Sequence, residues 1–241
     1  MKRLMVQILR QAAKVEQSAK KCIIRSSVKR AGVWFVDIPR TGSTSIKHDL
    51  VRRYGECFDK DFYREDAEGR KGKRRIGRPI CPEAHSTARE MRRLLGAGCF
   101  DSLYTFSFVR NPLDRFHSLF QYRRMAGDLG SGVSFKRYAC SLATPRFRDP
   151  DSPFYKRPYY LPMCDYLLDG NGDPIIDAWF KFEEREAALG RIGEETGIRF
   201  SDAHLESGKS LKSYTECYDA ESAECVRTFY KDDFAYFSYD G

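Results

Sequence analysis

Short apolar runs alternate with amphipathic stretches along this chain, which is the pattern of an α/β domain. Residues 33–38 and 103–109 are rich in β-branched and aromatic side chains and predict buried strands, and residues 174–182 predict a third. A polar turn and an amphipathic helix follow each of the first two strands. We therefore expect a parallel sheet flanked by helices, with the ligand across the carboxyl edge of the strands. Helices are expected at residues 46–54, 87–95, 135–142, 183–196 and 219–237, and directly after Asn111.

The first 30 residues have the pattern of a basic amphipathic helix. Apolar side chains recur there at helical spacing, and lysines and arginines lie outside the apolar stripe. Such a helix suits attachment to an anionic membrane face, and it also suits packing on its own domain or on a second copy in a homodimer. We favour packing, and divide the chain into a helical extension of residues 1–30 and a main domain of residues 31–241.

Composition indicates a soluble globular protein. Of the 241 residues, 41% are apolar and 32% charged, and no uncharged run approaches the roughly 20 residues that a membrane helix needs. None of the eight cysteines forms a Cys-x-x-Cys pair, and no histidine lies at zinc-like spacing from two of them. We expect reduced structural cysteines, no metal site, and a cytoplasmic protein that the N-terminal helix would hold at the membrane surface if it binds lipid.

Positive charge is concentrated near the N-terminus. Residues 1–80 carry 21 Lys and Arg against 9 Asp and Glu, whereas residues 181–241 carry 8 against 14. This bias suits an anionic ligand, whether a nucleotide, an acidic glycan, nucleic acid or a membrane surface. Residues 70–75 are the densest basic run and predict a solvated loop or a basic rim for an acidic acceptor. The run contains no stacking aromatics, so we expect no nucleic acid there.

A polar turn after the first predicted strand is the strongest candidate site. Pro39 ends the strand, and the turn leads into a helix whose positive end and N–H groups suit a phosphate or sulfate. Gly42 allows the backbone to approach an anion closely, and Arg40 adds a permanent positive charge with a forked set of N–H donors. An ordinary serine-capped turn is the alternative, and the Gly-x-x-x-x-Gly-Lys-Ser/Thr pattern of kinases is absent. The candidate anion-binding residues are Arg40, Thr41, Gly42, Ser43, Thr44 and Ser45.

A second anion site is predicted at the end of the strand over residues 103–109. Arg110 stands at its carboxyl end, and Asn111 followed by Pro112 is a strong helix start. Ser118 lies about two turns into that helix, on a face that can look back at Arg110. The two sites together suit a ligand with two separate anionic groups. His85 precedes the helix at residues 87–95, where a lone histidine is more often a cap than a catalyst.

Together these stretches resemble the PAPS-dependent sulfotransferases of the carbohydrate type, a sulfotransferase family 2-like group, over about residues 31–240. The resemblance rests on Ile38-Pro-Arg-Thr-Gly-Ser-Thr-Ser45 and on Phe108-Val-Arg-Asn-Pro-Leu-Asp-Arg-Phe-His-Ser118. It implies a P-loop-like three-layer α/β/α fold with a central parallel sheet. It also implies PAPS (3′-phosphoadenylyl sulfate) as co-substrate, no metal, and a hydroxyl acceptor on a glycan or glycolipid.

Residue roles follow from the same resemblance. Residues 40–45 would hold the 5′-phosphosulfate of PAPS, Arg110 and Ser118 its 3′-phosphate, and His85 would be the general base. Arg40 would stabilise developing charge, but it stands where the family usually has lysine and is too weak an acid to protonate a leaving group. Two alternatives stay open: a nucleotide-dependent kinase-like transferase, and a non-catalytic binding protein for an acidic polymer or nucleic acid, for which residues 70–75 matter and His85 does not.

Overall fold

The computed structural model describes residue 22 and residues 24–54, 63–65, 71–73, 85–144, 159–201 and 213–240. At its centre is a three-stranded parallel sheet in the order β1-β4-β5, so the α/β prediction is confirmed. Val33 lies opposite Tyr104, and Phe106 lies opposite Ala178. The strands are β1 (Val33–Val36), β4 (Tyr104–Val109) and β5 (Ala178–Lys181).

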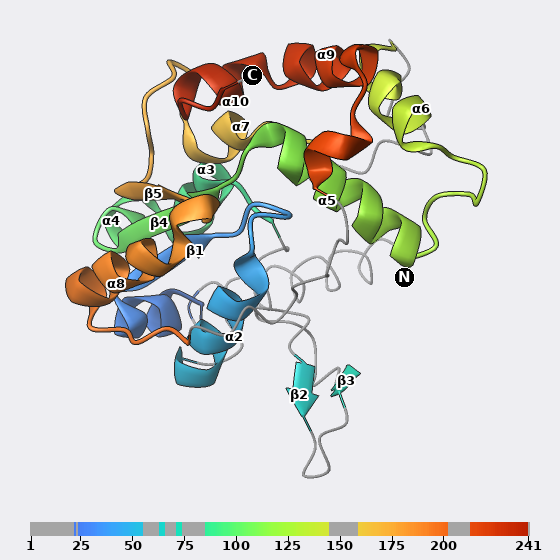
Figure 1. Cartoon of the computed structure of the whole chain (residues 1–241). Coiled ribbons are helices and arrows are strands. Elements are labelled where there is room, and N and C mark those ends of the chain that lie inside the picture. Colours follow the sequence, from blue (N-terminus) through green and yellow to red (C-terminus); the bar gives the residue numbers. More distant parts are fainter. Residues whose placement is uncertain are drawn as a thin grey trace, which may run out of the picture.

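Helices surround this sheet (Figure 1). All four residues of β1 and five of the six in β4 are buried, as expected for a parallel sheet covered on both faces. One hydrophobic core joins the sheet to α2, α3 and α8, and a second lies among α5, α6 and α9. The helices are α2 (Ser43–Tyr54), α3 (Ala88–Leu95), α4 (Ala97–Phe100), α5 (Pro112–Met125), α6 (Phe135–Cys140), α7 (Met163–Leu167), α8 (Arg185–Thr196), α9 (Ala220–Phe229) and α10 (Lys231–Tyr236).

Two helix starts form as the local sequence predicts. Asn111 caps α5 by accepting a hydrogen bond from the backbone N–H of Leu113 at 3.0 Å, and Pro112 follows as the first helical residue. Thr87 and Glu90 form a reciprocal capping box at the start of α3. These caps fix where each helix begins, and therefore where Arg110 and His85 stand before them.

Three predicted elements differ from the structure. The third strand begins at Ala178 rather than at residue 174, because the Asp177 carboxylate accepts from the backbone N–H and hydroxyl of Thr105, at 2.7 and 2.6 Å, where the ladder would otherwise continue. The expected helix at 219–237 is broken at Tyr230, whose buried hydroxyl donates to the Tyr160 carbonyl at 3.2 Å. Part of the basic run expected to be a loop is strand β3 (Lys71–Lys73), paired antiparallel with β2 (Tyr63–Glu65).

The described part of the N-terminal segment packs on the main core. Residues 24–31 are helical, and Ile24 and Val28 are buried in the same core as the sheet. Residues 1–21 lie outside the described residues, so the predicted extension is seen only at its end. Six described cysteines are free, and two of these, Cys99 and Cys164, are buried. No helix within the described residues has the length and apolar character to cross a membrane.

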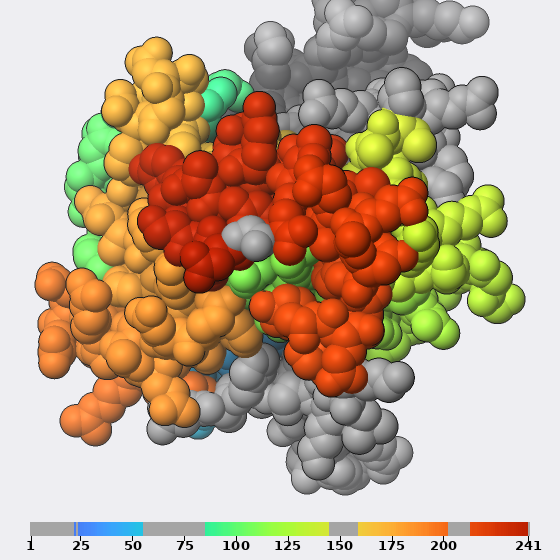
Figure 2. All heavy atoms as spheres, turned by 45° about the horizontal axis from the view of Figure 1, so that its top comes forward, coloured from blue at the N-terminus to red at the C-terminus, as the bar shows by residue number. Residues whose placement is uncertain are grey.

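The C-terminal helices cover one side of the molecule. Figure 2 shows the red residues of α9 and α10 lying across this face, between the orange residues that include β5 and α8 and the yellow-green residues of α6. Asp233 of α10 ties them down, because its buried carboxylate accepts from the backbone N–H groups of Met163 and Cys164, both at 2.8 Å. Helix α10 thus holds the start of α7 in place, and α7 in turn follows the segment that carries Tyr159.

Candidate active site

Residues 37–42, which join β1 to α2, form the centre of the site, and we call them the anion loop. The Thr41 hydroxyl donates to the Ile38 carbonyl at 2.9 Å and so tightens the loop from within. Ser43 and Ser45 already belong to the first turn of α2, together with Thr44. N–H groups in the first turn of a helix have no partner inside the helix, and no acidic residue lies in this turn. The loop and helix end therefore form a site suited to an anion.

Backbone strain marks this loop. Arg40 has φ 68° and Gly42 has φ 78°, so two residues of the loop adopt the left-handed conformation. A Cβ on Gly42 would lie 2.3 Å from Cε2 of Phe182, which is closer than real side chains come. Glycine is therefore required here by backbone angle and by space. Arg40 keeps a conformation that costs a non-glycine residue free energy, as functional sites often do.

Three arginines from other elements hold the carbonyl oxygens of the anion loop. Arg115 donates from Nε to the Pro39 carbonyl at 3.1 Å, and Arg110 donates from Nη1 to the Arg40 carbonyl at 3.2 Å. Arg185 donates from Nη2 to the Ser45 hydroxyl at 2.6 Å and from Nη1 to the Gly42 carbonyl at 3.4 Å. The loop is thus fixed from α5, from the end of β4 and from α8, which explains how its strained backbone persists.

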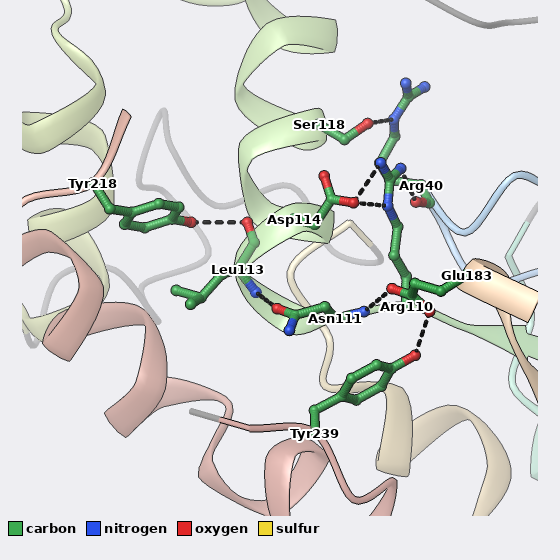
Figure 3. A network of polar contacts seen from close by, with 9 residues as sticks. All are labelled: Arg40, Arg110, Asn111, Leu113, Asp114, Ser118, Glu183, Tyr218 and Tyr239. Atoms are coloured by element: carbon green, nitrogen blue, oxygen red, sulfur yellow. Dashed lines mark hydrogen bonds and ion pairs between the residues drawn. The ribbon is translucent and has the colours of Figure 1, made fainter. Parts of the chain in front are cut away.

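The Arg40 side chain leaves the loop and meets α5 (Figure 3). Its Nε donates to the Ser118 hydroxyl at 3.1 Å, and its guanidinium lies 4.9 Å from the centre of the Tyr122 ring. The sequence predicted that Ser118 would look back at Arg110, whereas the structure pairs it with Arg40. The consequence is that the two predicted anion sites share one polar surface.

Arg110 stands at the carboxyl end of β4, as predicted, and most of its donors are engaged. Its Nε and Nη2 both contact Asp114 Oδ2, each at 2.8 Å, and its guanidinium lies 4.7 Å from the centre of the Phe182 ring. With the bond to the Arg40 carbonyl, these contacts use three of its five N–H groups. Glu183 lies nearby and accepts from the backbone N–H of Asn111 at 2.8 Å. Arg110 is therefore held in place with part of its fork still able to bind a ligand.

His85 is in contact with a largely buried carboxylate, that of Asp37, which the sequence did not single out. Its Nδ1 lies 3.0 Å from Asp37 Oδ2 and 3.1 Å from the Asp37 backbone oxygen. Lys47 Nζ lies 3.0 Å from the same Oδ2. Burial raises the pKa of Asp37, but Lys47, His85 and Ser43 lower it more, so its pKa falls well below the ordinary value. Its position in the sequence could have indicated a role, because Asp37 directly follows β1 at the carboxyl edge of the sheet.

Two tyrosines connect His85 with Arg40. The Tyr159 ring centre lies 5.5 Å from that of His85 and 5.9 Å from that of Tyr122, on which it is stacked. Tyr122 in turn lies beneath the Arg40 guanidinium. Burial and the neighbouring Tyr122 raise the pKa of Tyr159 to about 12, so its phenol is neutral at physiological pH. An imidazole, two aromatic faces and a guanidinium thus follow one another along the edge of the site.

Comparison with known proteins gives one match. The family model described as the sulfotransferase family matches residues 28–240, which includes every site residue above. No curated protein and no solved structure matches the chain significantly. In the described ranges, no cluster of three or more His, Cys, Asp and Glu side chains could hold a metal ion.

Proposed function

Because the chain belongs to the sulfotransferase family, we propose that it transfers the sulfuryl group of PAPS to a hydroxyl group on a carbohydrate acceptor. Family membership identifies a transferase of sulfuryl groups. The donor, the acceptor class and the residue roles are our proposal. The observation that carries it is the hydrogen bond between Arg40 and Ser118, which joins the anion loop to α5 and lets one ligand contact both anion sites.

PAPS has a phosphosulfate at its 5′ end and a phosphate on its 3′ oxygen, and the site offers donors for both. Residues 40–45 would hold the phosphosulfate through the loop, the first turn of α2 and the Arg40 guanidinium. Arg110 and Ser118 would hold the 3′-phosphate. The Ser118 hydroxyl oxygen accepts a hydrogen bond from Arg40 Nε. The hydroxyl can therefore use its own hydrogen to bind a phosphate oxygen of the ligand.

The reaction is an in-line displacement at sulfur. The acceptor oxygen forms the new bond to sulfur, the bond from sulfur to the 5′-phosphate oxygen breaks, and its electron pair leaves with adenosine 3′,5′-bisphosphate (PAP). His85 takes the acceptor proton. Arg40 and the N–H groups at the start of α2 stabilise negative charge on the sulfuryl and phosphate oxygens, and Arg40 keeps its own protons throughout.

The acceptor would lie against Tyr122 and Tyr159. These rings occupy the edge of the site between Arg40 and His85, which is where a hydroxyl must sit to reach both sulfur and base. Aromatic faces with a polar tip suit a ring-shaped acceptor that also forms hydrogen bonds. This favours a sugar, and sulfation of a protein tyrosine or a lipid hydroxyl would be a different outcome of the acceptor assay.

The donor is tested by calorimetric titration with PAP against 5′-AMP, which lacks the 3′-phosphate. We expect clear preference for PAP. Binding of neither would contradict the proposal and favour the non-catalytic binding protein for an acidic polymer or nucleic acid, whereas tight ATP binding would favour the kinase-like transferase.

The base is tested with His85→Ala, followed by transfer of radiolabelled sulfate from PAPS to a panel of glycans, glycolipids and phenols. We expect turnover to be lost while PAP affinity stays, because the base contacts the acceptor and not the nucleotide. His48→Ala, on the partly exposed side of α2, is the matched control and should keep full turnover. Normal turnover of His85→Ala would refute the base assignment.

A further inference from the structure

Asp37 and His85 come from different parts of the fold and meet beside the anion loop. Asp37 follows β1, His85 precedes α3, and 48 positions separate them in the chain. Their side chains are 12% and 15% exposed, so the contact lies largely away from solvent. We propose that Asp37 is a positioning residue for the transfer reaction: its carboxylate keeps the Nδ1–H tautomer of His85, which leaves Nε2 as the base. This inference rests on the proposed function.

The tautomer follows from the atoms around Nδ1. The Asp37 carboxylate oxygen lies 3.0 Å from Nδ1, and the Asp37 backbone oxygen lies 3.1 Å from it. A carbonyl oxygen and an ionised carboxylate can only accept hydrogen bonds. Nδ1 must therefore carry a hydrogen, and in the neutral ring this leaves Nε2 without one.

The carboxylate is suited to this role because it stays ionised. Lys47 on α2 lies 3.0 Å from the same oxygen, and with His85 it keeps the pKa of Asp37 low in spite of burial. Lys47 thus helps to keep a carboxylate, and not a carboxylic acid, beside the histidine. When Nε2 takes the acceptor proton, the imidazolium that forms lies directly against a negative charge and is stabilised by it.

His85 also has an unusual backbone conformation. Its φ of 64° places it in the left-handed region, which is unusual for a residue with a side chain. Both hydrogen-bond acceptors for Nδ1 belong to Asp37, one on the side chain and one on the backbone. They hold the ring beside Tyr159, whose ring centre lies 5.5 Å from that of His85.

The proton, the new bond and the electron pair of the transfer step are all accounted for. The acceptor proton moves to Nε2, the acceptor oxygen forms its bond to sulfur, and the leaving phosphate keeps the electron pair of the broken bond. Asp37 remains a carboxylate throughout. His85 afterwards returns its proton to solvent.

The first test needs no substrate, and it uses a variant only to assign a signal. Nitrogen NMR of the protein labelled in its four histidines reports which ring nitrogen carries the hydrogen, and the His85 signal is the one missing from His85→Ala. We expect the Nδ1–H tautomer for the neutral ring of His85. An Nε2–H tautomer would overturn the proposal even if sulfuryl transfer is confirmed.

The second test is Asp37→Asn, which keeps the shape but can offer an N–H to Nδ1. We expect kcat to fall on the order of 10³- to 10⁴-fold, as for other carboxylates that orient a catalytic histidine, with PAP affinity unchanged and the His85 signal shifted toward Nε2–H. Asp37→Glu should recover part of kcat, because it restores the carboxylate. Asp101→Asn, which removes an exposed ion-pair partner of Arg92, is the matched control.

The outcomes separate this inference from the function on which it rests. A kcat for Asp37→Asn within about threefold of wild type would refute the positioning role while leaving sulfuryl transfer intact. Absence of any transfer by the wild type would refute the proposed function, and the tautomer measurement would still decide whether Asp37 orients His85. Loss of PAP binding by Asp37→Asn would show that Asp37 holds the anion loop instead.

Discussion

Gly42→Ala is the sharpest perturbation that the structure offers. The new Cβ would lie 2.3 Å from Cε2 and 2.7 Å from Cδ2 of Phe182, on a backbone with φ 78°. Left-handed backbone costs a non-glycine residue about 1–2 kcal/mol, and overpacking typically adds about 1–3 kcal/mol. We therefore expect the free energy of unfolding to fall by about 2–5 kcal/mol. Phe182 also contacts the Arg110 guanidinium, so PAP affinity should fall by about tenfold or more.

The assay is urea unfolding followed by circular dichroism, with PAP titration on the same samples. Gly190→Ala is the matched control, because Gly190 is a helical residue of α8 with nothing within 4 Å of its would-be Cβ. There alanine should stabilise the protein by roughly 0.5–1 kcal/mol, since it lowers the entropy lost on folding. The same chemical change thus has opposite signs at two positions.

Phe182→Ala separates the steric part of the effect from the backbone part. In that background Gly42→Ala should cost only the left-handed strain, about 1–2 kcal/mol, because the ring that clashes is gone. A cost below about 0.5 kcal/mol for Gly42→Ala in the wild type would refute the reasoning, since surface changes without such features stay within that range. An equal cost in both backgrounds would refute the steric part alone.

Two further predictions concern charge. Arg110→Ala should weaken PAP by about 10- to 100-fold, the range for lost charge-assisted hydrogen bonds, while 5′-AMP loses little in calorimetry; equal losses would remove Arg110 from the 3′-phosphate. Because folding lowers the pKa of Asp37, its stabilising contribution is present above its unfolded pKa of about 3.9 and disappears as the pH falls toward its folded pKa. The stability lost in Asp37→Asn should therefore be largest near neutral pH and shrink below about pH 4 in urea unfolding, and a constant loss across pH would contradict this.

Features encoded in neighbouring residues were predictable from the sequence. The strand, turn and helix around Gly42 follow from apolar runs and a proline, and Asn111 before Pro112 marks where α5 starts. The parallel sheet follows because strands and helices alternate.

Contacts made through the tertiary fold were not predictable in this way. Asp37 and His85 meet across 48 positions, and Arg40 and Ser118 across 78, and no local pattern encodes either pair. The break at Tyr230 also depends on tertiary packing, because it lets a buried tyrosine reach the Tyr160 carbonyl. Helical periodicity continues through this position, so the sequence suggested one helix where the core requires two.

Arg40 and His85 share an uncommon property, since both have side chains on left-handed backbone. Each costs the fold about 1–2 kcal/mol relative to glycine, at positions where the proposed chemistry needs a guanidinium and an imidazole. Laboratory evolution that rewards heat resistance alone would therefore favour glycine or asparagine at both positions, and the surviving variants would be robust and inactive. Selection for thermal stability should therefore include a turnover assay in every round. At Arg40 and His85, selection for stability and selection for catalysis favour different residues.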